Sequence, residues 1–159
     1  MDSRNITFSD CIAWGGYARC FGITGEVNKQ ISDVTFRDCA VIYRDGVWNN
    51  DRIGSLVVVA EQTEGGIDNI LFENIEIFRD EGRAILVKIY DEEAENFEMK
   101  NIVFRNISYT SYLPSKIAGN DSDTNTVQAE LENITAYGKK VTLPSLLFNI
   151  GRYSDVTIK

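Results

Sequence analysis

Apolar and polar positions alternate in five aligned segments spread along the whole chain. The four clearest pairs of apolar positions are Ile6 and Phe8, Val34 and Phe36, Ile70 and Phe72, and Ile102 and Phe104. A weaker fifth segment spans residues 128–134, and a sixth begins at Asp155. Period two is typical of a β-strand that buries one face, whereas an α-helix repeats every 3.6 residues. The pattern therefore predicts strands throughout, with no helical segment between them.

An Asp or Asn closes each segment, just before another small or apolar residue. These closing residues are Asp10, Asp38, Asn74, Asn106 and Asn133, at steps of 28, 36, 32 and 27 residues. Asp and Asn tolerate the left-handed backbone that a sharp bend requires, and stacked side-chain amides can bond to one another in a ladder. Repeats of this length with short strands are typical of a solenoid. We therefore predict an all-β solenoid of about five coils with three strands per coil, forming one domain over residues 1–159.

The same stacking explains two other features of the sequence. Cys11 and Cys39 each follow a bend residue, so we expect them to lie one above the other as small core side chains without a redox role. Asn106 and Asn133 match the N-glycosylation pattern but occupy the bend itself, where a sugar would disrupt the stack. Asn5 matches it too, without a secretory context.

Composition excludes several classes of function. The 159 residues are 43% hydrophobic and 25% charged, which excludes disorder, and no window is apolar enough for a membrane span. The net charge of −8 argues against nucleic acid as a partner. The chain has no histidine, so acid–base chemistry would have to come from carboxylates, lysine or tyrosine. We expect no cofactor and no metal, and we interpret the acidic run 91–95 as a solvated turn. Residues 1–4 do not look like a signal peptide, so the chain as it stands is expected to be cytoplasmic.

Several runs of residues carry a resemblance to a known family. They are Arg4-Asn-Ile-Thr-Phe-Ser-Asp-Cys11, Gly15-Gly16-Tyr17, Cys20-Phe-Gly-Ile23, Ile31-Ser-Asp-Val-Thr-Phe-Arg-Asp-Cys39, and the later stretches 82–88, 100–107 and 114–119. Together they resemble the C-terminal half of polygalacturonase-type enzymes, which belong to glycoside hydrolase family 28 and the pectin-lyase-like superfamily. The resemblance implies a right-handed parallel β-helix and an association with carbohydrate.

The chain departs from that family at its catalytic signatures. The family's Asn-Thr-Asp and Asp-Asp motifs have no counterpart here, and Gly15-Gly16-Tyr17 stands where the family has Gly-His-Gly. The Arg-Ile-Lys position falls by coil count near residues 56–61, which do not match it, while Arg83 and Lys88 lie one coil later. Whether the chain is an enzyme is therefore left open, because a shared fold alone implies no activity.

The resemblance places a sugar cleft along the outer side of the first strand of each coil. Period two then predicts which side chains face outward there: Thr24, Glu26, Val57, Val59, Glu61, Leu86, Lys88 and Tyr90. We expect polysaccharide binding through Thr24, Lys88 and Tyr90, joined by Tyr17, Arg19 and Trp48 from the neighbouring loops. One alternative is an active hydrolase with a rebuilt acid pair, Glu26 and Glu61, since glycosidases use two carboxylates about 5–9.5 Å apart. Another is an assembly protein that binds no sugar.

The first repeat begins in mid-pattern at Ile6, which leaves the end of the solenoid without a polar cap. Such an end presents apolar side chains and an unpaired strand edge. We therefore expect a homo-oligomer formed through this exposed coil end, most simply a two-fold dimer.

Overall fold

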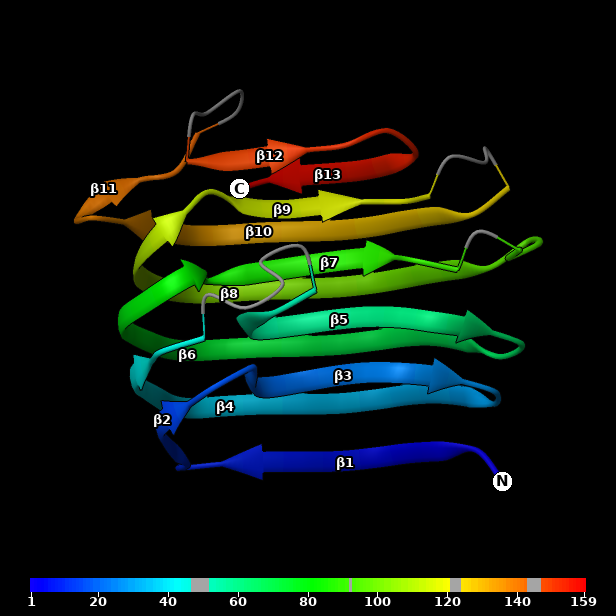
Figure 1. Ribbon diagram of the computed structural model, residues 1–159, viewed down its shortest axis with the longest axis horizontal. Helices are drawn as coiled ribbons and strands as arrows, with labels where there is room; N and C mark the ends of the chain where they lie inside the picture. Colours follow the sequence, from blue (N-terminus) through cyan, green and yellow to red (C-terminus); the bar gives the residue numbers. More distant parts are fainter. Residues whose placement is uncertain (47–51, 92, 121–123, 143–146) are drawn as a thin grey trace.

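The computed structural model describes residues 1–46, 52–91, 93–120, 124–142 and 147–159, and these contain strands and turns but no helix. Coils stack one on another from the N-terminal end to the C-terminal end (Figure 1). One sheet contains β1 (Ser3–Ser9), β2 (Ile12–Gly16), β4 (Gln30–Arg44), β6 (Gly66–Arg83), β8 (Glu98–Leu113), β10 (Thr126–Ala136), β11 (Lys139–Lys140) and β13 (Ser154–Ile158). The other contains β3 (Arg19–Val27), β5 (Gly54–Thr63), β7 (Ile85–Ile89), β9 (Ser115–Ala118) and β12 (Phe148–Ile150).

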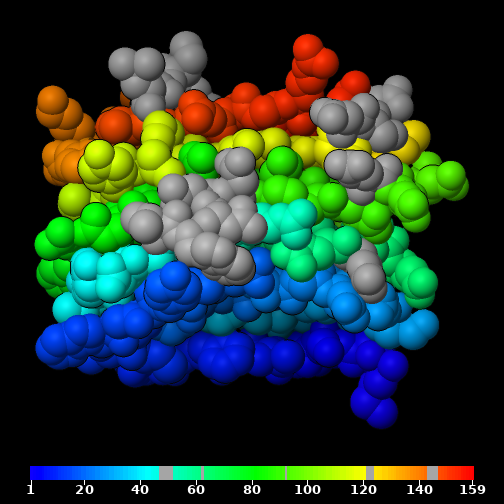
Figure 2. All heavy atoms as spheres, viewed as in Figure 1, coloured from blue at the N-terminus to red at the C-terminus, as the bar shows by residue number. Residues whose placement is uncertain are grey.

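Each complete coil contributes one strand to each sheet. The larger sheet has the order β1-β4-β6-β8-β10, the smaller one has β12-β9-β7-β5-β3, and all of these neighbours are parallel. The coils consequently form continuous layers through the molecule in Figure 2. These observations confirm the predicted all-β solenoid of about five coils.

The long strands of the larger sheet bend at the predicted Asp and Asn positions. The backbone φ angle lies between 52° and 57° at Asp10, Asp38, Asn74, Asn106 and Asn133. The bend divides each long strand into two straight segments, so each coil has three faces. We call the smaller sheet the first face, the segments before the bend the second face, and the segments after it the third face, which includes β2.

A second set of bends opens the same segments and was not predicted. Asn5, Asp33, Asn69 and Asn101 also have left-handed φ angles, between 51° and 58°. Asn69 donates its side-chain amide to Asp33 Oδ1 over 2.7 Å. The residue types were visible in the aligned segments, because each of these four segments begins with Asn or Asp as well as ending near one.

The core is a set of stacks that run parallel to the solenoid axis. Phe8, Phe36, Phe72 and Phe104 lie on successive coils with ring centroids 4.9–5.0 Å apart and nearly parallel planes. This separation matches the spacing of about 4.8 Å between neighbouring strands. Leu131 takes the place of phenylalanine in the next coil. Inward positions of the other faces are mostly aliphatic, so the alternation of buried and outward side chains fixes the register of each coil on the next.

The outer side of the first face is covered at its centre. Val57, Val59 and Leu86 point away from the core, as predicted, but they are fully buried in a separate apolar cluster, with Tyr90 packed against it. The open cleft expected along this face is therefore interrupted where the resemblance placed its floor.

The N-terminal coil leaves part of the core stack exposed. Ile6 and Phe8 are 37% and 45% exposed, whereas their neighbours on the next coil, Val34 and Phe36, are 3% and 4% exposed. Of the described strands only β4 pairs with β1, so one edge of β1 is free.

Candidate functional site

Two of the predicted site residues, Arg19 and Glu61, form an ion pair on the first face. Arg19 lies at the start of β3 and Glu61 near the end of β5, and Arg19 Nη2 donates to Glu61 Oε1 over 3.2 Å. Arg52 Nη1 lies 3.8 Å from the same oxygen. Arg19 Nε also donates to the Arg52 carbonyl oxygen over 3.2 Å, which ties the segment before β5 to the start of β3.

Two other predicted residues, Lys88 and Tyr90, meet in the same region. The Lys88 Nζ lies 4.3 Å from the centre of the Tyr90 ring, and the Arg52 guanidinium lies 5.0 Å from it. Each cation–π contact at a partly exposed site contributes about 0.5–1 kcal/mol. The cluster thus joins polar groups to the apolar patch beneath Tyr90.

Glu26 and Glu61 are not opposite each other in the first-face sheet. The register shifts after Gly25, so that Glu26 lies opposite Gln62 and Glu61 is the extra residue of a bulge. Glu61 accepts from Arg19 and faces Arg52, which is the arrangement of an ion-pair anchor. Glu26 is exposed.

The remaining predicted residues lie apart from this cluster. Thr24 is exposed on β3 opposite Val59. Tyr17 is 62% exposed in the turn before β3. Trp48 lies outside the described residues.

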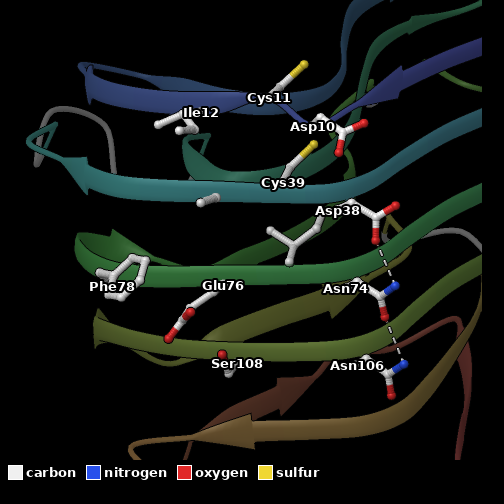
Figure 3. Close-up of a pocket in the computed structure, with 12 residues that line it drawn as sticks. Asp10, Cys11, Ile12, Asp38, Cys39, Asn74, Glu76, Phe78, Asn106 and Ser108 are labelled. Atoms are coloured by element: carbon white, nitrogen blue, oxygen red, sulfur yellow. Dashed lines mark hydrogen bonds between the residues drawn. The ribbon is translucent and has the colours of Figure 1, made fainter.

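A groove of about 540 Å³ lies on the third face, beside the bend (Figure 3). It crosses four coils, and its floor and walls come from β2, β4, β6 and β8 together with the bend residues. The lining residues are Asp10, Cys11, Ile12, Asp38, Cys39, Ala40, Asn74, Ile75, Glu76, Phe78, Asn106 and Ser108.

One edge of the groove is a ladder of side-chain amides. Asn133 Nδ2 donates to Asn106 Oδ1 over 2.8 Å, Asn106 Nδ2 to Asn74 Oδ1 over 3.0 Å, and Asn74 Nδ2 to Asp38 Oδ1 over 2.9 Å. The amide nitrogens of Asn106 and Asn133, which match the glycosylation pattern, are therefore occupied by the ladder. Each hydrogen bond repeats the same amide donor one coil further along, and the last is accepted by the Asp38 carboxylate.

At its N-terminal end the ladder has two neighbouring carboxylates and no amide donor between them. Ser9 is opposite Arg37 and Ile12 is opposite Ala40, so Asp10 lies beside Asp38. Arg37 Nη1 reaches Asp38 Oδ2 over 3.4 Å. Within the described part of the chain, no side chain donates to the carboxylate of Asp10.

The other edge of the groove is apolar and open to solvent. Ile12 is 73% exposed and Phe78 is 52% exposed. Beside the ladder runs an outward-facing column of residues on neighbouring strands, which begins at Ile12 and continues through Ala40, Glu76 and Ser108. Ala40 contributes only a methyl group to the floor of the groove, and Glu76 and Ser108 add polar groups to it.

The two stacked cysteines are side by side beneath the groove, as predicted (Figure 3). Cys11 Sγ donates to the Ser9 carbonyl oxygen over 3.3 Å, and Cys39 Sγ donates to the Arg37 carbonyl oxygen over 3.1 Å. Burial raises the pKa of the Cys39 thiol. A neutral thiol bonded to the backbone is a packing group and a poor nucleophile.

This groove was not predicted, because the resemblance placed the expected cleft on the first face. The signal was nevertheless present. Cys11 and Cys39 follow a bend residue and face inward, and Ile75 and Ile107 hold the same position in their segments, so the next residue of each strand must face outward. Those next residues are the column of Ile12, Ala40, Glu76 and Ser108.

Comparison of the chain with protein-family models, with curated proteins and with solved structures found no match. The resemblance to polygalacturonase-type enzymes therefore stays an expectation from the repeats quoted above. Over the residues that the structure describes, no set of three or more Cys, Asp and Glu side chains is arranged to hold a metal ion. The same residues include no helix long and apolar enough to cross a membrane.

Proposed function

We propose that this protein binds polysaccharide along the groove of the third face. The observation that carries the proposal is the division of the groove into a hydrogen-bonding edge, formed by the Asp and Asn ladder, and an apolar edge, formed by Ile12 and Phe78. The groove extends over four coils, so it offers repeated contacts to a repeated ligand.

A sugar ring has matching chemistry. Its hydroxyl groups donate and accept hydrogen bonds, and carboxylate and amide oxygens such as those of Asp38, Glu76 and Asn106 accept from them. Its C–H face is apolar and packs against exposed side chains such as Phe78. Strands about 4.8 Å apart place equivalent groups at a spacing close to the length of one sugar unit. A chain lying along the solenoid axis then meets similar groups at each coil.

The first-face cluster is a competing location for the same function. It contains four of the residues predicted from the sequence, Arg19, Glu61, Lys88 and Tyr90, while Thr24 lies on the same sheet and Tyr17 in the turn before it. Its cations and ring are already engaged with one another, and the patch below them is buried. The groove on the third face presents its apolar edge to solvent, and for that reason we favour it.

A glycan array probed with the full chain tests the proposal, followed by calorimetry with each glycan that binds. Phe78→Ala removes the exposed apolar edge and is expected to weaken binding by about fivefold, the effect of about 1 kcal/mol. Tyr17→Ala is the matched control, because it removes an exposed aromatic side chain of the first-face region, and we expect no change. Loss of binding in the Tyr17 variant alone would place the site on the first face. An array without any bound glycan would contradict the proposal.

We also propose that the exposed N-terminal coil associates with a second copy of the chain. Ile6, Phe8 and the free edge of β1 form a surface that the next coil covers elsewhere in the solenoid. Pairing of two such ends around a two-fold axis would bury both. Light scattering at micromolar concentration is expected to show a dimer that Phe8→Asp converts to a monomer. A monomer of 17.9 kDa for the unmodified chain would contradict this proposal.

A further inference from the structure

The groove on the third face carries negative charge only. Asp10, Asp38 and Glu76 line it, and among the lining residues none is lysine or arginine. We infer that the groove takes glycans that carry free amino groups and excludes those that carry carboxylates. This inference rests on the proposed function and names the class of ligand for that site.

The ladder itself indicates where an amino group would bind. Asn74 donates to Asp38 over 2.9 Å, and an asparagine at position 38 would donate to Asp10 in the same way. The chain instead has two acids on neighbouring coils, a pairing of like charges that destabilises adjacent strands. The donors missing at this end of the ladder are those that a ligand ammonium supplies, since it has three N–H groups and one positive charge.

The surroundings of the two acids fit a ring that bears such a group. Asp10 and Asp38 lie on one edge of the groove, and Ile12 lies beside them (Figure 3). Ala40 is the neighbour of Ile12 on the next strand and contributes only a methyl group to the floor. When the amino group of a sugar points toward the two acids, the face of the sugar ring lies over this floor. Arg37 contacts Asp38 from outside the groove over 3.4 Å, and its side chain is half exposed, so it offsets only part of the negative charge.

Three ligands separate the inference from the proposed function. Calorimetry with the full chain compares a glucosamine oligomer, the N-acetylglucosamine oligomer of the same length, and a galacturonate oligomer. Acetylation removes the charge and keeps the ring, so the expected order is glucosamine first, N-acetylglucosamine at least fivefold weaker, and galacturonate without binding. Equal binding of the first two, or preferred binding of galacturonate, would overturn the inference and leave glycan binding intact. If no glycan on the array or in this set binds, the proposed function itself fails.

Two substitutions test the acids without breaking the ladder. Asp10→Asn and Asp38→Asn keep a residue that tolerates the left-handed bend. Each is expected to weaken glucosamine binding about fivefold, the upper range for one exposed ion pair, and to weaken binding of the uncharged acetylated oligomer less, so that the preference for glucosamine falls. Added salt should weaken glucosamine binding to the unmodified chain for the same reason.

Asp33→Asn is the matched control. Asp33 lies on the same coil as Asp38, has the same left-handed backbone, and accepts an amide from the next coil, but it does not line the groove. We expect it to bind glucosamine as the unmodified chain does. An equal loss in Asp33→Asn and Asp38→Asn would show that only the overall charge matters, and would overturn the assignment to the groove.

Discussion

Arg44 and Asp80 form an ion pair in which both side chains are fully buried. Arg44 ends β4, and Asp80 occupies the equivalent position on the next coil. Asp80 also accepts from Ser55 Oγ over 2.5 Å and from the Gly82 backbone N–H over 2.6 Å. Arg44 Nη1 donates to the Gly46 carbonyl oxygen over 2.7 Å. The pair holds the corner at which the third face turns into the first.

Asp80→Asn is expected to destabilise the protein by about 3–5 kcal/mol, because it leaves the Arg44 charge buried without a counter-charge. Urea unfolding followed by circular dichroism measures the change. Glu81→Gln is the control, since it breaks the exposed pair with Arg79 and should cost less than about 1 kcal/mol. Equal effects of the two variants would contradict a structural role for the buried pair.

Cys20 lies close to this corner and should be the least reactive of the three thiols towards alkylation. Burial raises the pKa of the Cys20 thiol to about 11, and the Asp80 carboxylate acts in the same direction. At pH 8 only about one molecule in a thousand then carries the reactive thiolate, against about a quarter at an ordinary pKa of 8.5. Iodoacetamide labelling of the native protein with peptide mass spectrometry follows each cysteine separately. Labelling of Cys20 at the rate of a free thiol would refute this prediction.

The fold was predictable because each coil repeats the same short sequence pattern. The alternation of Ile70 and Phe72 predicted a strand, and Asn74 after them predicted the bend. The same logic applied to Asn69, but only the residue that closes each segment was interpreted as a bend. The position of the bulge at Glu61 was not predictable from period two, because a bulge breaks that period without a change in composition.

The candidate site was only partly predictable. Arg19 and Glu61 were named separately, and their ion pair depends on where the chain enters β5, which strand patterning does not specify. Val57 and Leu86 were expected to line an open cleft, yet an outward position is exposed only if nothing covers it. The groove depends on the small side chain of Ala40. Its effect could not be predicted from the sequence, because it depends on which side chains lie beside it on the neighbouring coils.

Asp33 should make the stability of the fold depend on pH in the acid range. The hydrogen bond from the Asn69 amide is the main reason why the pKa of Asp33 is lowered. A carboxyl group with a lowered pKa in the folded state contributes stability above its unfolded value of about 3.9, and this contribution is lost as the pH falls through the folded value. Asp33→Asn should therefore show a shallower fall in melting temperature below about pH 4 than the unmodified chain. Parallel curves for the two proteins would contradict the expected linkage.

Asn74 should show how much the ladder contributes to stability. Asn74→Ala loses two amide hydrogen bonds of about 1 kcal/mol each and places alanine at a φ of 54°, which costs about 1–2 kcal/mol more. Asn74→Gly loses the same bonds but tolerates the backbone angle. Urea unfolding should therefore rank the unmodified chain first, the glycine variant second and the alanine variant last. An alanine variant as stable as the glycine variant would show that the bend carries no strain.

We propose that the ligand surface lies on the third face, and nuclear magnetic resonance of the isotope-labelled full chain tests this placement most directly. Titration with the glycan that binds most tightly in the calorimetric set is predicted to shift the backbone amide signals of Ala40, Glu76 and Ser108, which lie along the floor of the groove. The signals of Thr24 and Lys88 on the first face should stay in place. Shifts confined to Thr24 and Lys88, or no shifts at all at saturating concentrations, would contradict the claim.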